Sequence, residues 1–421
     1  MGFLNRNLNQ AVISLGGKGS RLSKLTLDLP KPLFEINGRS SLERCIENLS
    51  IQGIRKYIFL LHYKYEIFLE ESLNLEKKYN VKIISHNEFS PRGEAGSLRE
   101  VLKELEDTFL FINGDIIFDV DLNRFSNFHF NMSADITLAT HLTSHPEDSD
   151  CIIENLSSSI FDFKYKQDNL LNKYFYLGNA GIAIVNKDIV ADTEIFASNN
   201  ISFFKDYAIK NHLNGKKVLS YNTTEYIKDM GTVARFKQVS QDLKNKLVNF
   251  CSYKKKQSAL FLDRDNTIIK CPEKKYITKE NQIYFYQDRL KKIAEISSNF
   301  NIVILISNQP QISMGKISMQ EVINLNGLII NYCKEKNLNI GVSTFCPHHP
   351  DFGFENEVRE LKLNCFCRKP SPGMFLEQIY LRNIEIKDSL MIGDSWRDKK
   401  AAENLNIKFL HSKQLDSSSY L

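Results

Sequence analysis

The sequence contains no long hydrophobic run. Its longest apolar stretches, such as residues 300–306, have the length of a buried strand and fall well short of the roughly 18 residues that a membrane-spanning helix requires. The sequence also lacks the charged and then apolar start of a secretory leader. We therefore expect a soluble, cytoplasmic protein that has no membrane partner.

Cysteine is too sparse and too irregularly spaced for a secreted disulfide framework. Eight cysteines are spread through 421 residues, whereas secreted disulfide scaffolds are short and rich in cysteine. A reducing compartment fits this usage better.

A large surplus of charge is absent as well. Lys and Arg number 55 against 50 Asp and Glu, which gives a formal net charge of +5 at pH 7. Nucleic-acid-binding domains concentrate basic residues on one face. The composition therefore argues against a nucleic-acid partner and is compatible with small phosphorylated substrates.

Short β-rich runs alternate with helical patterns along the whole chain. This alternation predicts an α/β fold with mainly parallel sheets. The predicted strands are residues 10–15, 56–61, 81–85, 108–112, 136–141, 302–307, 341–345 and 389–392.

The length of the chain exceeds what one ordinary core needs and favours two large domains. The polar segment SYKKKQ precedes a fresh strand, and its lysine run is typical of a solvated linker. We predict a first domain at 1–245, a linker at 246–257 and a second domain at 258–421.

A glycine-rich loop follows the first predicted strand, in AVISLGGKGSRL. Glycines let backbone N–H groups turn toward an anion, and nearby cations meet phosphate oxygens. A plain tight turn is the alternative. A second cation, Lys31, stands between two prolines in LPKPLFEINGRS. The candidate phosphate-binding residues are Gly16, Gly17, Lys18, Gly19, Arg21 and Lys31.

These two segments, followed in order by EFSPRGEAGSL, FINGD, YLGNAGI and YIKDMGT, closely resemble the sugar-phosphate nucleotidyltransferases. The resemblance implies a Rossmann-like, GT-A-like domain in which a sugar 1-phosphate attacks the α-phosphorus of a nucleoside triphosphate. It implies that Arg21 and Lys18 stabilise the departing pyrophosphate and that Lys31 stabilises the attacking side. No general base is needed, because the nucleophile is already an anion.

The same resemblance assigns the remaining residues of the first domain. Glu88 and Gly93 would lie near the nucleobase, Asn179 and Gly181 near the sugar, and Lys166 near the sugar phosphate, although the family's usual Glu-Lys reads Tyr165-Lys166 here. Asp115 and Asp229 would share a Mg²⁺ ion with the triphosphate. Turn or cap roles are the alternative for both aspartates and for Asn179.

The second domain opens with FLDRDNT, which places Asp263 and Asp265 at a strand end. With LISNQ, CRKPSPGM and MIGDSWRD further on, this resembles the haloacid dehalogenase superfamily of phosphatases. The resemblance implies that Asp263 attacks phosphorus and that Asp265 first protonates the leaving alkoxide and then deprotonates water.

The resemblance also implies a phosphate site and a second Mg²⁺ site. Mg²⁺ would be held by Asp394, Asp263 and the Asp265 carbonyl. Asp398 would support the Asp394 carboxylate without contacting the ion. The phosphate and substrate contacts would come from Ser307, Asn308, Gln309, Arg368 and Lys369.

Three positions depart from that family's pattern. Asn266 replaces a glycine, and Asn tolerates the backbone angles of glycine. Met314 replaces an arginine that contacts substrate, and Ser395 replaces a lysine after the metal-binding aspartate.

A C-x-H pair and a C-x-C pair flank a charged loop before Arg368. Thiolates and imidazole are the preferred ligands of tetrahedral zinc, and four protein ligands leave no open position for a catalytic water. Ordinary reduced cysteines and a C-x-C redox pair are the alternatives. The set resembles the structural zinc loop of heptose bisphosphate phosphatases. It consists of Cys346, His348, Cys365 and Cys367.

Together the resemblances predict a bifunctional enzyme. It would remove the 7-phosphate of a D-glycero-D-manno-heptose 1,7-bisphosphate and transfer a nucleotidyl group, GMP from GTP, to heptose 1-phosphate. Its partners would be these small molecules, with a homo-oligomer possible. A histidinol-phosphate or other metabolite phosphatase, or one domain acting as a non-catalytic sensor, are the alternatives.

Overall fold

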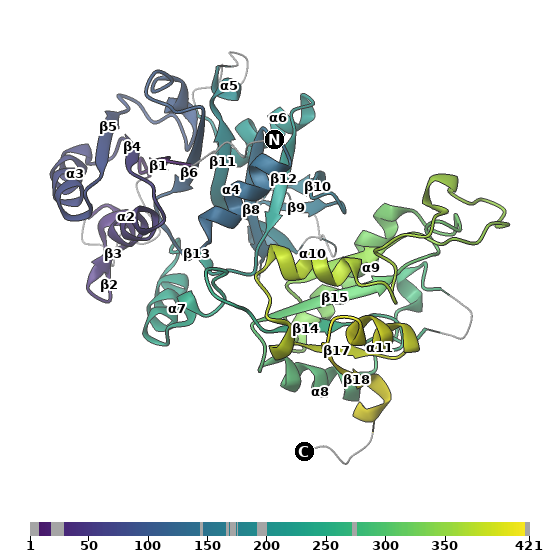
Figure 1. Cartoon of the computed structure of the whole chain (residues 1–421). Coiled ribbons are helices and arrows are strands. Elements are labelled where there is room, and N and C mark those ends of the chain that lie inside the picture. The colour runs from purple at the N-terminus through teal and green to yellow at the C-terminus, as the bar shows by residue number, and fades with distance from the viewer. Residues whose placement is uncertain are drawn as a thin grey trace. The chain divides into compact units, whose positions relative to one another are not determined.

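The computed structural model divides into two compact units (Figure 1). The first comprises Met1–His141, Ser149–Gln167 and Gly178–Ser252, and the second Leu142–Asp148, Asp168–Leu177 and Tyr253–Leu421. The division after Ser252 falls inside the predicted linker, and the predicted domain bounds stay a prediction. The structure describes residues 8–17, 29–143, 146–165, 168, 174, 176–191, 200–271 and 276–416.

The first unit is built on a nine-stranded sheet in which β10-β9-β11-β6-β1-β4-β5 follow one another and β8 pairs with β11 and β12. The predicted strands are present with small shifts at their ends. The strands are β1 (Gln10–Ser14), β4 (Lys56–Leu61), β5 (Lys82–Asn87), β6 (Thr108–Asn113), β8 (Ile136–Leu142), β9 (Cys151–Glu154), β10 (Ile160–Lys164), β11 (Leu177–Asn186) and β12 (Val218–Asn222).

This sheet is mixed, which qualifies the expectation of a mainly parallel one. Strands β6, β1, β4 and β5 run parallel, whereas β11 runs antiparallel to β6 and β10 antiparallel to β9. Only a short turn joins β9 to β10, and a connection of that length can form a hairpin but not a parallel crossover. Two shorter strands, β7 (Ile116–Phe118) and β13 (Ile227–Asp229), pair antiparallel beside the sheet.

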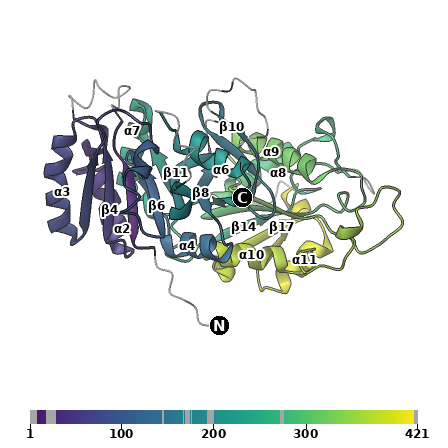
Figure 2. The same ribbon diagram turned by 90° about the horizontal axis from the view of Figure 1, so that it is seen from above.

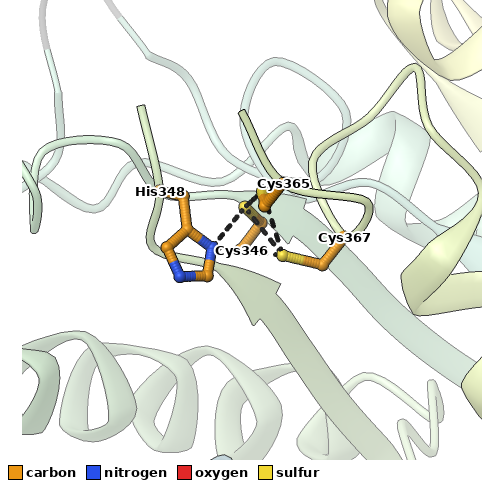
Figure 3. A group of neighbouring side chains, drawn as sticks. All are labelled: Cys346, His348, Cys365 and Cys367. Atoms are coloured by element: carbon orange, nitrogen blue, oxygen red, sulfur yellow. Dashed lines mark hydrogen bonds between the residues drawn. The ribbon is translucent and has the colours of Figure 1, made fainter. Parts of the chain in front are cut away.

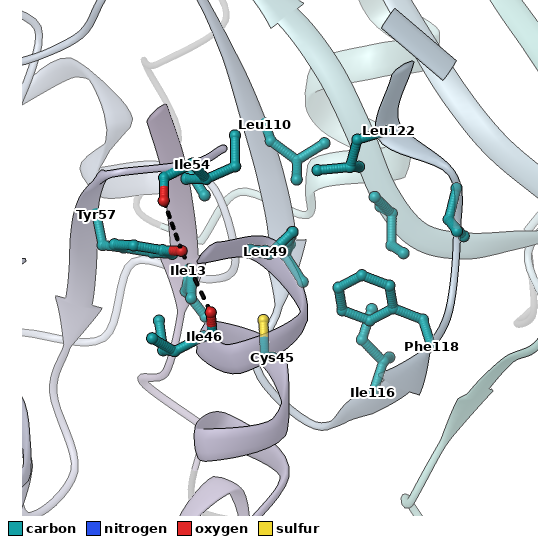
Figure 4. Packing of buried hydrophobic residues seen from close by; sticks show 14 of the residues in the cluster. Ile13, Cys45, Ile46, Leu49, Ile54, Tyr57, Leu110, Ile116, Phe118 and Leu122 are labelled. Atoms are coloured by element: carbon teal, nitrogen blue, oxygen red, sulfur yellow. Dashed lines mark hydrogen bonds between the residues drawn. The ribbon is translucent and has the colours of Figure 1, made fainter. Parts of the chain in front are cut away.

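Helices bury the sheet of the first unit. Figure 4 shows Cys45, Ile46 and Leu49 of α2 against Ile13 of β1 and Leu110 of β6, all of them buried. The helix begins where the Ser40 hydroxyl accepts a hydrogen bond from the Glu43 N–H, a regular N-cap. The helices are α2 (Ser41–Ile51), α3 (Tyr65–Tyr79), α4 (Leu122–Asn131), α5 (Lys187–Val190), α6 (Lys210–Leu213) and α7 (Val233–Lys244).

The second unit holds a parallel five-stranded sheet in the order β16-β15-β14-β17-β18. Four of its strands, β14 to β17, are mostly buried, as expected for a sheet covered on both faces, whereas the edge strand β18 is only partly buried. The strands are β14 (Ala259–Leu262), β15 (Ile302–Asn308), β16 (Val342–Cys346), β17 (Leu390–Gly393) and β18 (Lys408–His411).

Helices lie on both faces of this second sheet. Figure 2 shows α8 (Gln287–Ser297) and α9 (Met319–Glu335) on one face and α10 (Gly373–Leu381) and α11 (Trp396–Glu403) on the other. The predicted α/β class is therefore confirmed for both parts of the chain. Within the described residues, no helix combines the length and the hydrophobicity needed to cross a membrane.

Candidate active sites

A cavity of about 480 Å³ opens in the first unit where β1, β4, β5 and β6 end. The carboxyl ends of parallel strands are where α/β sheets bind ligands. Six of the residues predicted for the nucleotidyltransferase site line this cavity. They are Gly16, Gly17, Lys31, Glu88, Gly93 and Asp115.

The two predicted metal ligands of the first site issue from neighbouring strands. Asp229 ends β13 and pairs with Ile116 of β7, the residue after Asp115, and the Met230 N–H donates to the Asp115 carbonyl over 3.0 Å. The Asp115 carboxylate accepts a hydrogen bond from the ammonium of Lys31, which is buried. Backbone pairing thus brings the two aspartates to neighbouring strand ends, where the Lys31 ammonium contacts Asp115 and acts electrostatically on Asp229.

Asp229 is held in its ionised form by its own surroundings. Burial would raise the pKa of this carboxyl, but the Gly231 N–H at 2.7 Å and the Arg235 guanidinium at 2.9 Å from both oxygens outweigh burial and lower that pKa. The Lys31 ammonium acts in the same direction. A carboxylate that stays ionised is a suitable ligand for a divalent cation.

The predicted base-reading loop folds back on a distant segment. Gly93 has a φ of +79°, and a Cβ there would lie 2.5 Å from the Ile201 carbonyl oxygen. Only glycine fits such a position. The loop carries the buried Glu88 carboxylate on the same cavity wall as Gly16.

Asn179 and Gly181 lie on β11, outside the residues that line the cavity. Gly181 has a φ of +73°, and a Cβ there would come within 3.0 Å of Asn113 Nδ2. Asn179 Oδ1 lies 3.5 Å from the Gly181 N–H, a contact of the turn type that we raised as its alternative. Four predicted residues fall outside the described residues: Lys18, Gly19, Arg21 and Lys166.

Sequence reasoning assigned no role to several polar residues that line this cavity, among them His62 and Asn113. Asn113 precedes the glycine of FINGD, and its Oδ1 is buried without a hydrogen-bond partner among the described atoms. Both residues stand directly at strand ends, at β4 and β6. That position was the available signal, because ligand-binding residues gather at the carboxyl ends of parallel strands.

The second unit brings one lysine between two aspartates. Lys369 Nζ lies 2.6 Å from Asp263 Oδ1, to which it donates a hydrogen bond, and 2.6 Å from Asp398 Oδ1. It also donates to the Ile306 carbonyl over 2.8 Å. All three charged residues are buried. A buried ammonium is stable only when it is paired and hydrogen-bonded in this way.

The two carboxylates respond differently to that lysine. Burial raises the pKa of Asp263 well above its ordinary value, and Lys369 opposes this only in part, while neighbouring Asp398 adds to the rise. Burial would also raise the pKa of Asp398, yet Lys369 and the Ser395 hydroxyl lower it. Both carboxylates in turn raise the pKa of Lys369 against the effect of burial.

The other predicted phosphatase residues surround this cluster. Gln309 Nε2 donates to Asp265 Oδ2 at 2.9 Å and to Ser307 Oγ at 3.1 Å. Asn308 and Lys369 exchange two hydrogen bonds, from the Asn308 amide to the Lys369 carbonyl and from the Lys369 N–H to Asn308 Oδ1. The strand end of β15 is thereby fixed against the segment that carries the lysine.

Three carboxylates of this site form a group that can hold a metal ion. One oxygen from each of Asp263, Asp394 and Asp398 lies within 4.8 Å of the others. The Asp398 carboxylate lies 2.6 Å from Lys369 Nζ and accepts a 2.6 Å hydrogen bond from the Ser395 hydroxyl. Its predicted role, to support the Asp394 carboxylate without contacting the ion, stays a prediction.

Two of the departures from the family pattern have a structural account. Asn266 adopts a φ of +56°, so the expectation that it replaces glycine in a left-handed conformation is confirmed. Ser395 is the N-cap of α11 and donates its hydroxyl to Asp398 Oδ2 over 2.6 Å. The third position, Met314, is buried.

The C-x-H and C-x-C pairs converge on one point (Figure 3). The three sulfur atoms lie 3.2 to 3.4 Å apart, and His348 Nδ1 lies 3.2 Å from Cys367 Sγ and 3.6 Å from Cys346 Sγ. A disulfide would bring two sulfurs to about 2.05 Å, whereas ligands of one tetrahedral ion stand roughly 3.5 Å apart. The four residues can therefore hold a metal ion.

The cluster already contains one acidic thiol. Hydrogen bonds from Cys346, Cys365 and His348 lower the pKa of Cys367 to about 5, although burial opposes them. The pKa of the Cys346 thiol is raised instead. The hydrogen bond with Cys367 raises it most, and burial adds to the rise. The thiolate is the form of cysteine that binds a metal, so a lowered pKa of Cys367 favours metal binding.

Comparison with protein families separates the two parts of the chain. A nucleotidyl transferase model matches residues 10–246, more than half of the chain. The chain belongs to the nucleotidyl transferase family. A HAD-hydrolase-like model matches residues 366–412, so the C-terminal region is HAD-like, in agreement with the predicted fusion.

Curated relatives of the family match the first part of the chain. A D-glycero-alpha-D-manno-heptose 1-phosphate guanylyltransferase from Campylobacter jejuni is 30% identical over 211 residues, which cover 48% of this chain and 86% of that protein. One from Aneurinibacillus thermoaerophilus is 29% identical over 239 residues, 56% of this chain and 99% of that protein. A mannose-1-phosphate guanyltransferase from Yarrowia lipolytica is 30% identical over 185 residues, and the match covers 43% of this chain and only 50% of that relative.

Among solved structures, HddC from Yersinia pseudotuberculosis matches 56% of this chain and all of its own, with a TM-score of 0.48 and 23% sequence identity.

Proposed function

We propose that the chain is a bifunctional enzyme that makes a nucleotide-activated heptose. Its second part removes the 7-phosphate from D-glycero-D-manno-heptose 1,7-bisphosphate, and its first part transfers GMP from GTP to the resulting heptose 1-phosphate. The observation that carries the proposal is that a nucleotidyl transferase match over residues 10–246 and a buried Asp263–Lys369–Asp398 cluster occur on one chain. The names of the heptose 1-phosphate guanylyltransferase relatives support the choice of sugar and base.

In the first site the substrate supplies the nucleophile. An oxygen of the sugar 1-phosphate attacks the α-phosphorus of GTP, the bond from that phosphorus to the bridging oxygen breaks, and pyrophosphate leaves. Lys31 is placed to neutralise the incoming phosphate, and it lies beside Asp115. Mg²⁺ bound by Asp115 and Asp229 would neutralise the triphosphate, and the ionised state of Asp229 fits that ligand role.

In the second site the protein supplies the nucleophile. An Asp263 oxygen bonds to phosphorus as the bond to the sugar oxygen breaks, and Asp265 gives that oxygen a proton. Asp265 then takes a proton from water, which attacks phosphorus and releases phosphate and Asp263. Lys369 contacts Asp263 and balances the charge of the phosphoryl group. Mg²⁺ held by Asp263, Asp394 and the Asp265 carbonyl would add positive charge there.

The Cys346, His348, Cys365 and Cys367 group is proposed to be a closed structural zinc site. Three sulfurs and one imidazole nitrogen are a donor set typical of structural zinc, with no position left for water. The next two residues in the chain are Arg368 and Lys369. Arg368 donates to the His348 carbonyl over 3.1 Å, so an ion in the cluster would also fix the residues that meet the phosphate.

The order of the two reactions follows from their chemistry. The phosphatase must spare the anomeric phosphate, because that group is the nucleophile of the transferase. Hydrolysis of the 7-phosphate leaves the anomeric phosphate in place, so the product can serve as the substrate of nucleotidyl transfer.

The proposal is tested by incubating the protein with heptose 1,7-bisphosphate, Mg²⁺ and each of the four nucleoside triphosphates, and by identifying the products by mass. We expect phosphate, pyrophosphate and GDP-heptose with GTP. A parallel incubation with histidinol phosphate tests the alternative. Release of phosphate from histidinol phosphate and not from the heptose bisphosphate would favour the alternative phosphatase. Failure of one part to catalyse anything would favour a sensor domain.

A further inference from the structure

His62 is a cavity residue of the first unit to which the proposed chemistry assigns no role. It follows β4 directly, and Glu88 follows β5 directly. A Cβ built on Gly16 would lie 3.4 Å from His62 Cβ and 3.8 Å from Glu88 Oε2. Both side chains therefore border the same small space next to Gly16.

The hydrogen bond of the His62 ring determines what the ring offers to this space. Nδ1 lies 2.9 Å from the Glu88 carbonyl oxygen. A carbonyl oxygen can only accept, so Nδ1 carries the proton and Nε2 of the neutral ring presents a lone pair. The cavity wall next to Gly16 thus carries one imidazole acceptor beside a carboxylate.

The Glu88 carboxylate keeps accepting capacity toward the cavity. Glu88 is buried, and its Oε2 accepts a long hydrogen bond of 3.4 Å from the Arg92 N–H. An ionised carboxylate has about four acceptor positions, so this bond leaves most of them for a ligand. Glu88 and His62 line the same cavity, so two acceptor positions on Glu88 and one on His62 favour a ligand edge that consists of donors.

Guanine is the nucleobase whose edge has that pattern. Its N1–H and both hydrogens of its 2-amino group are neighbouring donors. Adenine and cytosine place an acceptor nitrogen beside their amino group, and uracil places one N–H between two carbonyls. A buried acceptor left unpaired by the wrong base costs affinity, so a wall of acceptors discriminates between the bases.

We propose that Glu88 and His62 together read guanine: Glu88 accepts from N1–H and from one 2-amino hydrogen, and His62 Nε2 accepts from the other. This inference rests on the proposed nucleotidyl transfer and adds His62 as a specificity-determining residue. Inosine triphosphate keeps N1–H and lacks the 2-amino group. The inference therefore predicts that loss of His62 affects GTP and not inosine triphosphate, whereas Glu88 serves both.

The test compares kcat/KM for GTP and for inosine triphosphate, with heptose 1-phosphate supplied, in the wild type, His62→Phe and His62→Gln. His62→Phe removes the acceptor and keeps a ring, so kcat/KM for GTP should fall by about 10- to 100-fold while that for inosine triphosphate stays unchanged. His62→Gln should restore much of the preference, since an amide oxygen can replace Nε2. His86→Phe is the control: His86 pairs with Glu100 at 2.8 Å and does not line the cavity.

A His62→Phe variant that keeps the wild-type preference for GTP over inosine triphosphate would overturn the inference and leave the proposed function intact. A wild type that transfers another nucleotide in preference to GMP would overturn the inference together with the choice of GTP in the proposed function. A wild type that transfers no nucleotide at all would refute the proposed function instead. If His62→Phe does not fold, His62→Ala, which also removes the acceptor, decides the matter through the same ratio.

Discussion

The two carboxylate sites are neutralised in different ways. In the first unit each aspartate has its own cation, Lys31 on Asp115 and Arg235 on Asp229, and the two carboxylate side chains are 31% and 41% exposed. In the second unit the single Lys369, 3% exposed, serves two aspartates that are nearly inaccessible.

The difference follows from where the nucleophile comes from. A substrate phosphate brings its own negative charge, so the first site needs only to bind and orient it, and its aspartates can stay partly exposed. In the second site a protein carboxylate is the proposed nucleophile, and burial of Asp263 raises its pKa. A buried cation is then required to favour the ionised form. The comparison predicts that the second unit is far more sensitive to loss of a single charge.

Replacing Asp263 by asparagine should have the largest effect. Asparagine keeps the shape but cannot attack phosphorus, so phosphate release should fall by at least about 10³-fold. Nucleotidyl transfer from supplied heptose 1-phosphate should be unchanged, since its residues stand in the other unit. The control is Asp288→Asn, an exposed residue in the first turn of α8. Loss of both activities in a folded variant would contradict independent sites.

Replacing Lys369 by methionine should destabilise the second unit. Two buried carboxylates would lose their cation, which costs about 3–5 kcal/mol of unfolding free energy near neutral pH. Chemical unfolding with metals chelated measures this loss. Lys399→Met, in an exposed pair with Glu403 at 3.9 Å, should change stability little.

The pH dependence of the Lys369→Met deficit gives an internal check. Lys369 lowers the folded-state pKa of Asp398 below its ordinary value of 3.8, so in the wild type this stabilisation is present above that pH and is lost as pH falls through the folded value. The variant lacks it. The difference between the two proteins should therefore be largest near neutral pH and shrink toward acid, and a difference that grows toward acid would refute the charge argument.

Gly315→Ala should destabilise the second unit through a steric clash. Gly315 has a φ of +68°, and a Cβ there would lie 1.6 Å from the Asn356 carbonyl oxygen. We expect a loss of about 2–4 kcal/mol. Gly353→Ala is the matched control, because its φ is +103° but nothing lies within 4 Å, so it should cost about 1 kcal/mol. If both variants lose the same unfolding free energy, the strain of a positive φ and not the clash with Asn356 would account for the destabilisation.

Replacing Cys365 by serine should have the smallest effect on catalysis and a clear one on metal content. The purified wild type should contain about one zinc per chain, and a hydroxyl in place of a thiolate should weaken its binding. Phosphatase activity should then fall by about 10-fold while nucleotidyl transfer persists. Cys251→Ser, outside the cluster, is the control. Zinc-free protein with reduced cysteines and full phosphatase activity would contradict a structural zinc site.

The sequence was sufficient for the aspartates that follow strand ends within a motif. Asp115, Asp263 and Asp394 each follow a run of apolar residues, and parallel strands bring such ends together. The left-handed backbone of Asn266 could also be predicted, because few residues tolerate it. The four residues of the Cys and His cluster were predicted from ligand spacing alone.

Residues whose role depends on tertiary contacts could not be placed in this way. His62 belongs to none of the quoted motifs and Asn113 is a member of FINGD without a predicted role, and the cavity shows that both side chains line the site. The hydrogen bonds between Ser395 and Asp398 at the start of α11 and the antiparallel pairing of β11 with β6 are likewise visible only in the structure. Arg235 lies on α7 and donates a hydrogen bond to Asp229 at the end of β13. Apart from their closeness in the chain, nothing in the sequence indicates this pair.

The most direct test of two independent sites acting in succession is a mixing experiment with heptose 1,7-bisphosphate, GTP and Mg²⁺. Asp263→Asn alone should make no GDP-heptose because it cannot release phosphate, and Asp115→Ala alone should make none because it cannot transfer GMP. An equimolar mixture of the two should make GDP-heptose, with heptose 1-phosphate passing through solution from one variant to the other. A mixture that makes none, although each variant is folded and keeps its one remaining activity, would contradict the account.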